Sequence, residues 1–276
     1  MKAAAFRGYL LLSLLIGFVT LGALLVDVFR DGLGHVDWGL VTDPPSSQPE
    51  LAGAGPAVLA TIYMMALLLL IAVPVGIATA IYLEEYADGE RWYNRLLEVN
   101  IQNLAAVPSI IWGILGLAFL VRGPIGLGRV LLAGALILGL LVLPTIIIAA
   151  REAIRAVPGS IRQGGLALGA TKWQVIWRQV LPAAAPGMAT GSILALSRAI
   201  GETAPLIMIG AVTYIAFNPT LLGEFTALPI QIYQWVRLPQ PEFKLLAAGG
   251  IIVLLSILLT MNAFAIWLRN RYQKRW

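Results

Sequence analysis

Six stretches of the chain are apolar over a length that can cross a lipid bilayer. They cover residues 9–28, 57–83, 104–121, 130–150, 186–210 and 245–268. A hydrocarbon core about 30 Å thick requires about 20 consecutive apolar residues in a helix. The pattern therefore predicts an all-α integral membrane protein with six transmembrane helices.

The composition supports this prediction. The 276 residues are 59% hydrophobic and 12% charged, with a mean hydropathy of +0.85, and so few polar residues cannot cover a soluble globule of this size. The sequence has no cysteine, which excludes disulfides, zinc-thiolate sites and thiol nucleophiles. The net charge of +5 is better explained by membrane orientation than by nucleic-acid binding.

The cations fall mostly on one side of the predicted membrane domain. If the chain starts inside, thirteen of the nineteen Lys and Arg residues are cytoplasmic: Lys2, Arg7, Arg91, Arg95, Arg151, Arg155, Arg162, Lys172, Arg178, Arg269, Arg271, Lys274 and Arg275. Cytoplasmic loops carry an excess of Lys and Arg, so both termini are expected in the cytoplasm. Residues 84–98 are the exception, because five acids outnumber two Arg there, although acids weigh little in this rule.

The N-terminal part is predicted to be an anchor. The first apolar run follows Lys2 and Arg7, as in a signal peptide, but it is long and no clear small-residue cleavage site ends it. The loop from Asp31 to Pro56, which contains the sequence Pro44-Pro45-Ser46-Ser47, is expected to be an irregular tether outside the cytoplasm.

A long polar insert, residues 151–182, separates the fourth and fifth runs; it is called the central loop below. Gly169 within it reaches left-handed dihedrals cheaply and predicts a helix end, and Thr171 is a candidate N-cap for the next helix. Five cations against the single acid Glu152 predict a cationic surface for a partner or for lipid headgroups. An ordinary positively charged cytoplasmic loop is the alternative.

The fifth apolar run contains two charged residues, Arg198 and Glu202. A charge near the bilayer centre costs on the order of 2.5 to 3.5 kcal/mol on insertion scales, so Arg198 must face protein or a water-filled path. Residues four apart share a helical face. Either the two residues form a structural ion pair, or Arg198 attracts an anion while Glu202 holds it when the path is empty.

Several phrases resemble a known family. The sequence Leu166-Ala-Leu-Gly-Ala-Thr171, followed by Leu181-Pro182, resembles the cytoplasmic "EAA" loop of ABC-transporter permeases, with Gln163, Gly164 and Gly165 in place of the leading Glu-Ala-Ala. The stretches Ala80–Ala87 and Asn103–Leu117 are similar to the second and third spans of phosphate-uptake permeases of the PstA type.

The same resemblance extends towards the C-terminus. The phrase Ser197–Pro205 is close to the "ARAIGETAP" sequence of phosphate permeases, and residues 228–235 and 239–243 are similar to that family's last periplasmic loop. Together these phrases cover roughly residues 58 to 265.

The resemblance implies the type I ABC importer permease fold, with residues 1–56 as an anchor helix and periplasmic loop and residues 57–276 as the permease domain. It implies import of inorganic phosphate across the bacterial inner membrane. The implied partners are a PstC-like permease, a dimer of PstB-like ATPases, a PstS-like phosphate-binding protein and membrane lipid. The chain is expected to be no enzyme and to bind no cofactor, because ATP and Mg²⁺ belong to the ATPase subunits.

The candidate site residues form two groups. The substrate-path candidates are Ser197, Arg198, Glu202 and Thr203. The ATPase-coupling candidates are Gly165, Leu166, Ala167, Gly169, Ala170, Thr171 and Lys172.

Other functions are weighed against this one. An importer of another oxyanion and an ion-coupled secondary transporter both fit a buried Arg-Glu pair, and an intramembrane enzyme would have only Glu202 and the distant His35 for acid-base chemistry. Residues 164–171 have the glycine spacing of a phosphate-binding loop, but Ala170 stands where that loop requires Lys. The aromatic segment 211–244 is either a gate or docking surface, or a helix that seals the bundle.

Overall fold

The computed structural model describes residues 2–212 and 214–272. The predicted cytoplasmic cations Lys274 and Arg275 lie outside these ranges, as does the side chain of Lys2. The α-helices are α1 (Lys2–Gly32), α2 (Trp38–Thr42), α3 (Gly55–Ile81), α4 (Trp92–Ala105), α5 (Ser109–Gly116), α6 (Leu131–Arg155), α7 (Gly159–Ala167), α8 (Lys172–Val175), α9 (Leu181–Ile200), α10 (Ala204–Met208), α11 (Leu228–Arg237) and α12 (Pro241–Tyr272). The 3₁₀ turns are η1 (Leu33–His35) and η2 (Pro49–Leu51), and the π-turns are η3 (Tyr82–Tyr86), η4 (Leu117–Val121) and η5 (Ile176–Val180).

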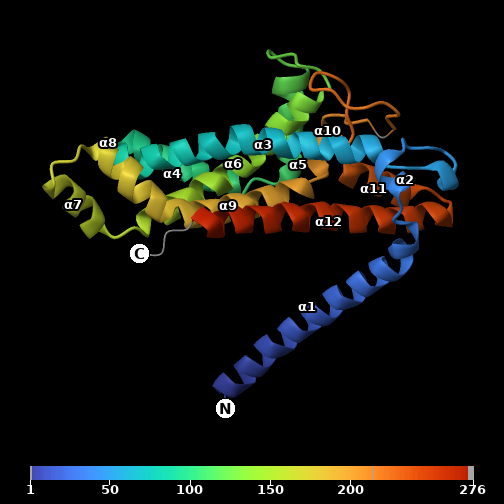
Figure 1. Cartoon of the computed structure of the whole chain (residues 1–276), viewed down its shortest axis with the longest axis horizontal. Helices are drawn as coiled ribbons and strands as arrows, with labels where there is room; N and C mark the ends of the chain where they lie inside the picture. Colours follow the sequence, from blue (N-terminus) through green and yellow to red (C-terminus); the bar gives the residue numbers. More distant parts are fainter. Residues whose placement is uncertain (1, 213, 273–276) are drawn as a thin grey trace.

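Four long helices, α3, α6, α9 and α12, run side by side along the long axis of the molecule (Figure 1). Helix α6 packs between α3 and α9, and its inward-facing side chains, such as Ile137 and Ile146, are completely buried. Helices α7 and α8 lie at one end of this bundle, and α2 and α11 lie at the other (Figure 1). Helix α6 contributes to two core clusters: its buried residues from Leu131 to Ile146 belong to one, and Ile147, Ala150 and Ile154 belong to a second together with Val175 of α8.

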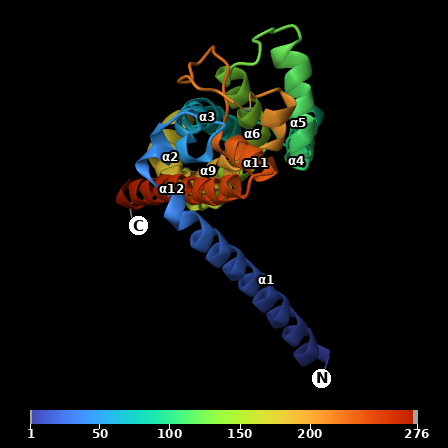
Figure 2. The same ribbon diagram turned by 90° about the vertical axis from the view of Figure 1, so that its right-hand side faces the viewer.

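Helix α1 leaves the bundle at an angle, as both views show (Figures 1 and 2). It contacts α12 near its own C-terminal end, where Gly32 lies against the backbone of Ala248 and the side chain of Ile252. The apolar length of α1 is exposed in this chain. A helix that is apolar and exposed along its length is suited to lipid or to another membrane subunit.

Within the described residues, five helical segments are long and apolar enough to cross a membrane: 6–35, 55–86, 131–155, 172–200 and 241–271. A sixth crossing results if α4 and the α5–η4 segment, which are bent by 105°, are one broken span. The predicted span 104–121 is interrupted: it starts in the last two residues of α4, and a bend at Val107-Pro108 separates these residues from α5 and η4. Proline lacks an N–H and disfavours helical dihedrals in the residue before it, so a bend at this point is expected.

The fifth predicted span, 186–210, also needs correction. Helical structure runs without interruption from Lys172 through η5 into α9 and stops at Ile200. Pro205 cannot donate a hydrogen bond to the carbonyl of Gly201, and the Thr203 hydroxyl donates to that carbonyl instead, at 3.3 Å. The hydrophobic run continues past this point, but the α9 helix does not.

The segment between α1 and α3 is not the irregular tether that the sequence predicts. It folds into η1, α2 and η2, and it buries Leu40 and Ala54 in a cluster with Trp235 and Phe243. Asp37 caps α2 by accepting a hydrogen bond from the backbone of Leu40, at 2.7 Å. The loop is therefore an ordered cover over this end of the bundle.

The aromatic segment 211–244 is divided between core and surface. Phe225, Trp235 and Phe243 are fully buried, so these three rings seal the bundle. Tyr214 and Phe217 are exposed. The sealing interpretation therefore applies to the three buried rings, whereas the exposed Tyr214 and Phe217 could belong to a gate or a docking surface.

Candidate transport path and central loop

Arg198 and Glu202 form an ion pair at the end of α9. The Nε of Arg198 donates to Oε1 of Glu202 at 3.2 Å. More than half of the Arg198 side chain is exposed, whereas the Glu202 side chain is only 17% exposed. A guanidinium has five N–H donors, so pairing through Nε leaves Arg198 capacity to bind an anion.

The ion pair lies near the middle of the bundle's length, with the Arg198 side chain at the surface. Helices α6 and α9 are antiparallel, because Gly187 packs against Ala153 and Gly191 packs against Ala149. Continuing this register places Arg198 about level with Val142, near the middle of α6. Arg198 also lies in the last turn of α9, where the negative end of the helix dipole favours a cation.

The other two substrate-path candidates have different surroundings. The hydroxyl of Ser197 lies 2.7 Å from the carbonyl of Ile193 and 2.7 Å from Oδ1 of Asn262 on α12. Thr203 bonds to the backbone at the break after α9. The structure thus brings Arg198 and Glu202 together, directs Ser197 towards α12, and uses Thr203 to satisfy the broken helix end.

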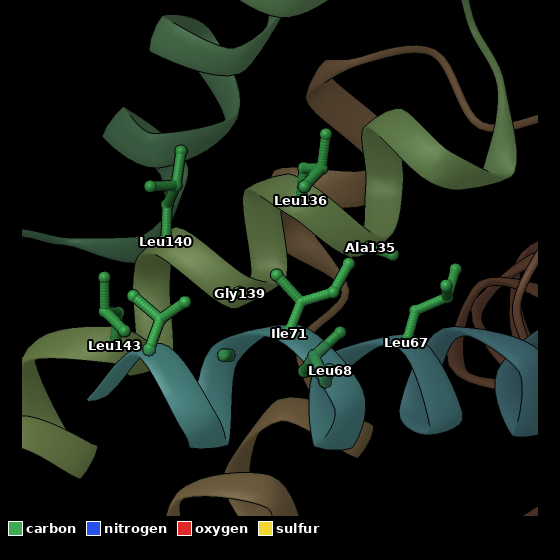
Figure 3. A pocket seen from close by; sticks show the side chains of 10 residues that line it. Leu67, Leu68, Ile71, Ala135, Leu136, Gly139, Leu140 and Leu143 are labelled. Atoms are coloured by element: carbon green, nitrogen blue, oxygen red, sulfur yellow. The ribbon is translucent and has the colours of Figure 1, made fainter. Parts of the chain in front are cut away.

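A cavity of about 140 Å³ between α3 and α6 is an unsuitable site for an anion (Figure 3). Its walls are aliphatic, formed by side chains such as Leu68, Ile71 and Leu140 together with the backbone at Gly139. An anion placed there would lose its hydration without gaining a hydrogen-bond donor. This cavity is therefore not an anion site.

The central loop has the local structure that its sequence predicts. Gly169 adopts a left-handed conformation with φ of +80° and ends the α7 segment. Thr171 caps α8 through a capping box: its hydroxyl accepts from the Gln174 backbone at 3.3 Å, and Gln174 Oε1 accepts from the Thr171 backbone at 2.9 Å. The predicted break and the predicted N-cap are both confirmed.

Gly165 holds α7 close to the segment that follows it. A β-carbon at this position would lie 2.8 Å from Cγ2 of Val175 and 2.6 Å from Oε1 of Gln179. The remaining coupling candidates surround an outward-facing tip: Leu166, Ala167, Gly169, Thr171 and Lys172 are exposed, and Ala170 is half-buried.

Apolar side chains extend this tip. Leu168 is 88% exposed, and the exposed rings of Trp173 and Trp177 stack with centroids 5.5 Å apart. An apolar projection of this kind is suited to a pocket on a partner.

The predicted cationic surface of the central loop needs correction. Three of its five cations are paired with acids from residues 82–98: Arg155 binds Glu84 through two bonds of 3.0 Å, Arg162 binds Glu85 at 2.7 Å, and Arg151 binds Glu98 at 2.9 Å. The Nζ of Lys172 lies 4.9 Å from the centroid of the Tyr86 ring. The charge of the loop is therefore largely neutralised within the chain.

These acids are the site residues that sequence reasoning missed. Glu84 and Glu85 follow the second apolar run directly, in the one predicted cytoplasmic segment where acids outnumber cations. That excess of acid was the available signal, because a cluster of acids facing a cluster of cations on the same side predicts pairing.

The comparisons with known proteins identify the family. A family model described as "Binding-protein-dependent transport system inner membrane component" matches residues 72–276. The chain belongs to this family. It is thus a multi-pass permease component of the inner membrane, which argues against both the ion-coupled transporter and the intramembrane enzyme.

Individual permeases of the family are similar over most of the chain. The phosphate transport system permease protein PstA of Xylella fastidiosa is 33% identical over 87% of this chain and 83% of its own length. The phosphate transport system permease protein PstA 1 of Mycobacterium tuberculosis is 33% identical over 72% of this chain. The alignment spans 64% of the length of that M. tuberculosis relative.

Comparison with a solved structure supports the fold assignment and nothing further. A chain of the bacterial alginate ABC transporter, in complex with an alginate pentasaccharide-bound periplasmic protein, superposes with a TM-score of 0.67 at 20% identity. The match covers 97% of this chain and 96% of that chain. The all-helical architecture of an ABC importer permease is therefore confirmed.

Proposed function

We propose that this chain is the permease subunit of an ATP-driven importer that carries inorganic phosphate across the inner membrane. The observation that carries the proposal is the Arg198–Glu202 pair level with the middle of α6. The similarity to PstA permeases of Xylella fastidiosa and Mycobacterium tuberculosis supports phosphate as the anion. In this proposal the chain itself performs no bond chemistry and binds no cofactor.

The proposed assembly contains four kinds of subunit. A PstC-like permease forms a heterodimer with this chain, a dimer of PstB-like ATPases with ATP and Mg²⁺ binds on the cytoplasmic side, and a PstS-like protein delivers phosphate from outside. Both termini and the central loop then lie in the cytoplasm, as the distribution of Lys and Arg predicts. Residues 1–56 act as the anchor and outer cover, and residues 57–276 form the permease domain.

Arg198 supplies the attraction for phosphate in this mechanism. When the path is empty, Glu202 neutralises Arg198 through the 3.2 Å bond. An arriving phosphate competes for the guanidinium, which suits it because Arg presents planar, paired donors to phosphate oxygens. Ser197 and Thr203 hold the helix end that carries the pair, through Asn262 of α12 and the carbonyl of Gly201.

The central loop carries the ATPase motion into the bundle. Residues Gly165–Lys172 form the projection on which the ATPase acts, and the exposed Leu168 lies at its tip. ATP binding closes the ATPase dimer, displaces α7 and α8, and turns the path outward; hydrolysis resets it. The loop thus biases an equilibrium between two states of the bundle.

Uptake of radiolabelled phosphate by vesicles that contain the assembled complex tests this proposal. Uptake should require ATP and the binding protein, and unlabelled phosphate should suppress it while sulfate, molybdate and a phosphonate in the same excess leave it unchanged. ATP-dependent uptake of radiolabelled sulfate or molybdate, with none of radiolabelled phosphate, would assign the chain to another oxyanion. Uptake that proceeds without ATP would reject the importer assignment.

A further inference from the structure

Glu84 and Glu85 connect the end of α3 to segments far along the chain. They lie in η3, the π-turn that continues α3, and their side chains are only 16% and 8% exposed. Their partners, Arg155 and Arg162, follow 71 and 77 residues later. A buried carboxylate that is left without a charged partner is strongly disfavoured, so these contacts fix the segments they join.

Arg162 makes the more extensive of the two connections. It belongs to α7, and its Nε and Nη2 donate to Oε1 of Glu85 at 2.9 and 2.7 Å. Its Nη1 donates to the carbonyl of Val157 at 2.7 Å, and Nη2 also reaches the carbonyl of Ile154 at 3.0 Å. One planar guanidinium therefore ties α7 both to η3 and to the C-terminal end of α6.

Glu84 extends the connection to a fourth element. Both of its oxygens accept from Arg155, at 3.0 Å each, and Oε2 lies 3.5 Å from Nε of Arg151. Arg151 in turn pairs with Glu98 of α4 at 2.9 Å. Two charge clusters thus meet at η3: Glu84 connects α3 to α6 and, through Arg151, to α4, while the neighbouring Glu85 connects α3 to α7.

The π-turn η3 ends α3 and brings several side chains together at one place. The turn of η3 carries both glutamates and Tyr86, whose ring receives Lys172 from α8. Contacts from α6, α7 and α8 therefore converge on five consecutive residues at the end of α3.

We infer that Glu85 and Arg162 are positioning residues that make α3 move together with α7 when the ATPase displaces the central loop. This inference rests on the proposed function and deepens it. The pair, called the α3–α7 joint, transmits the displacement because it is partly buried and has several bonds. A flexible surface contact would not transmit it.

The first test is the amount of phosphate transported per ATP hydrolysed by the complete reconstituted complex. Glu85→Gln keeps the shape of the side chain and removes its charge. ATP hydrolysis should continue in this variant while phosphate per ATP falls about fivefold or more, the lower end of typical allosteric coupling. Glu85→Asp, which keeps the charge, should recover part of the ratio. A native ratio in Glu85→Gln would overturn the inference.

Glu152→Gln is the matched control. Glu152 belongs to the same region, is largely exposed, and pairs with Arg155 within the same helix at 3.4 Å. This variant removes an equal charge without separating two elements. It should keep the native ratio, and an equal fall in both variants would show a general charge effect and contradict the joint.

A distance measurement tests the inference without any transported substrate, so a wrong assignment of phosphate leaves it valid. The chain has no native cysteine, and spin labels can be placed at the exposed positions Ser160 on α7 and Ala78 on α3. Their separation should stay constant between the nucleotide-free and ATP-bound complex, whereas a label pair at Ser160 and Leu259 of α12 should change. A changing Ser160–Ala78 distance, or a constant Ser160–Leu259 distance, would refute the joint even if Glu85→Gln fails to assemble.

Discussion

Gly164 and Gly165 are neighbours on α7, yet alanine at each should have opposite effects. Replacing a glycine in a helix interior by alanine stabilises the helix by about 0.5–1 kcal/mol. At Gly164 no atom lies within 4 Å of the added methyl group, so the full gain is expected. At Gly165 the same methyl group would lie 2.8 Å from Cγ2 of Val175 and 2.6 Å from Oε1 of Gln179.

The cost at Gly165 follows from these distances. Carbon atoms in contact prefer about 3.5–4.0 Å, so Val175 or α7 itself must move by roughly 1 Å. Gln179 can rotate its amide away, but Val175 is buried and has a stiff, β-branched side chain. Overpacking of this kind costs about 1–3 kcal/mol. After the gain in helix propensity, the packing of α7 against α8 should weaken by about 1–2 kcal/mol.

Hydrogen exchange of the α7 backbone amides in the assembled complex measures this difference. Gly165→Ala should accelerate exchange by about 5- to 30-fold, the factor that 1–2 kcal/mol represents, and should lower ATP-dependent uptake. Gly164→Ala should slow exchange or leave it unchanged, and should retain uptake. Equal protection of α7 in the two variants would refute the close approach of Gly165 to Val175.

Three further predictions concern local backbone chemistry. Gly169→Ala should lower the free energy of unfolding by about 1–2 kcal/mol, because the left-handed φ of Gly169, and not crowding around it, disfavours a side chain. Gly169→Asn should lower the unfolding temperature less than Gly169→Ala does, and equal unfolding temperatures of the two variants would contradict this explanation. Thr171→Val should lower the free energy of unfolding by about 1 kcal/mol because it removes the cap on α8, whereas Thr171→Ser should retain that cap. A Thr171→Ser variant as unstable as Thr171→Val would contradict the capping box. Gly191→Leu should reduce the yield of folded permease because Gly191 touches Ala149 of α6, so a native yield would argue against that helix contact.

The features that were predictable from sequence depend on short stretches of chain. The apolar runs found the long helices because hydropathy over about 20 residues decides membrane insertion. Gly169 and Thr171 were assigned correctly because left-handed glycines and N-caps act on the adjacent backbone. The break after Ile200 had its own local signal in Gly201 and Pro205, but the apolar run continues past both and conceals it.

The features that were missed depend on contacts across the fold. The pairing of Glu85 with Arg162 joins residues 77 positions apart, and no spacing rule connects such positions. The ordered loop before α3 was missed for the same reason, since Leu40 is buried by residues of α11 and α12 that come about 200 positions later. Composition alone therefore overstated both the charge of the central loop and the disorder of the outer loop.

The most direct test of the account is ATP-dependent phosphate uptake by the reconstituted complex with Arg198→Ala and Glu202→Ala, after assembly of each variant has been verified. Arg91→Ala serves as the control, because Arg91 is likewise an Arg in a local ion pair, with Asp88 at 3.2 Å, but lies outside the proposed path. Uptake should collapse in Arg198→Ala and persist in Arg91→Ala. Native uptake in an assembled Arg198→Ala complex would show that the residue is structural and that phosphate takes another path.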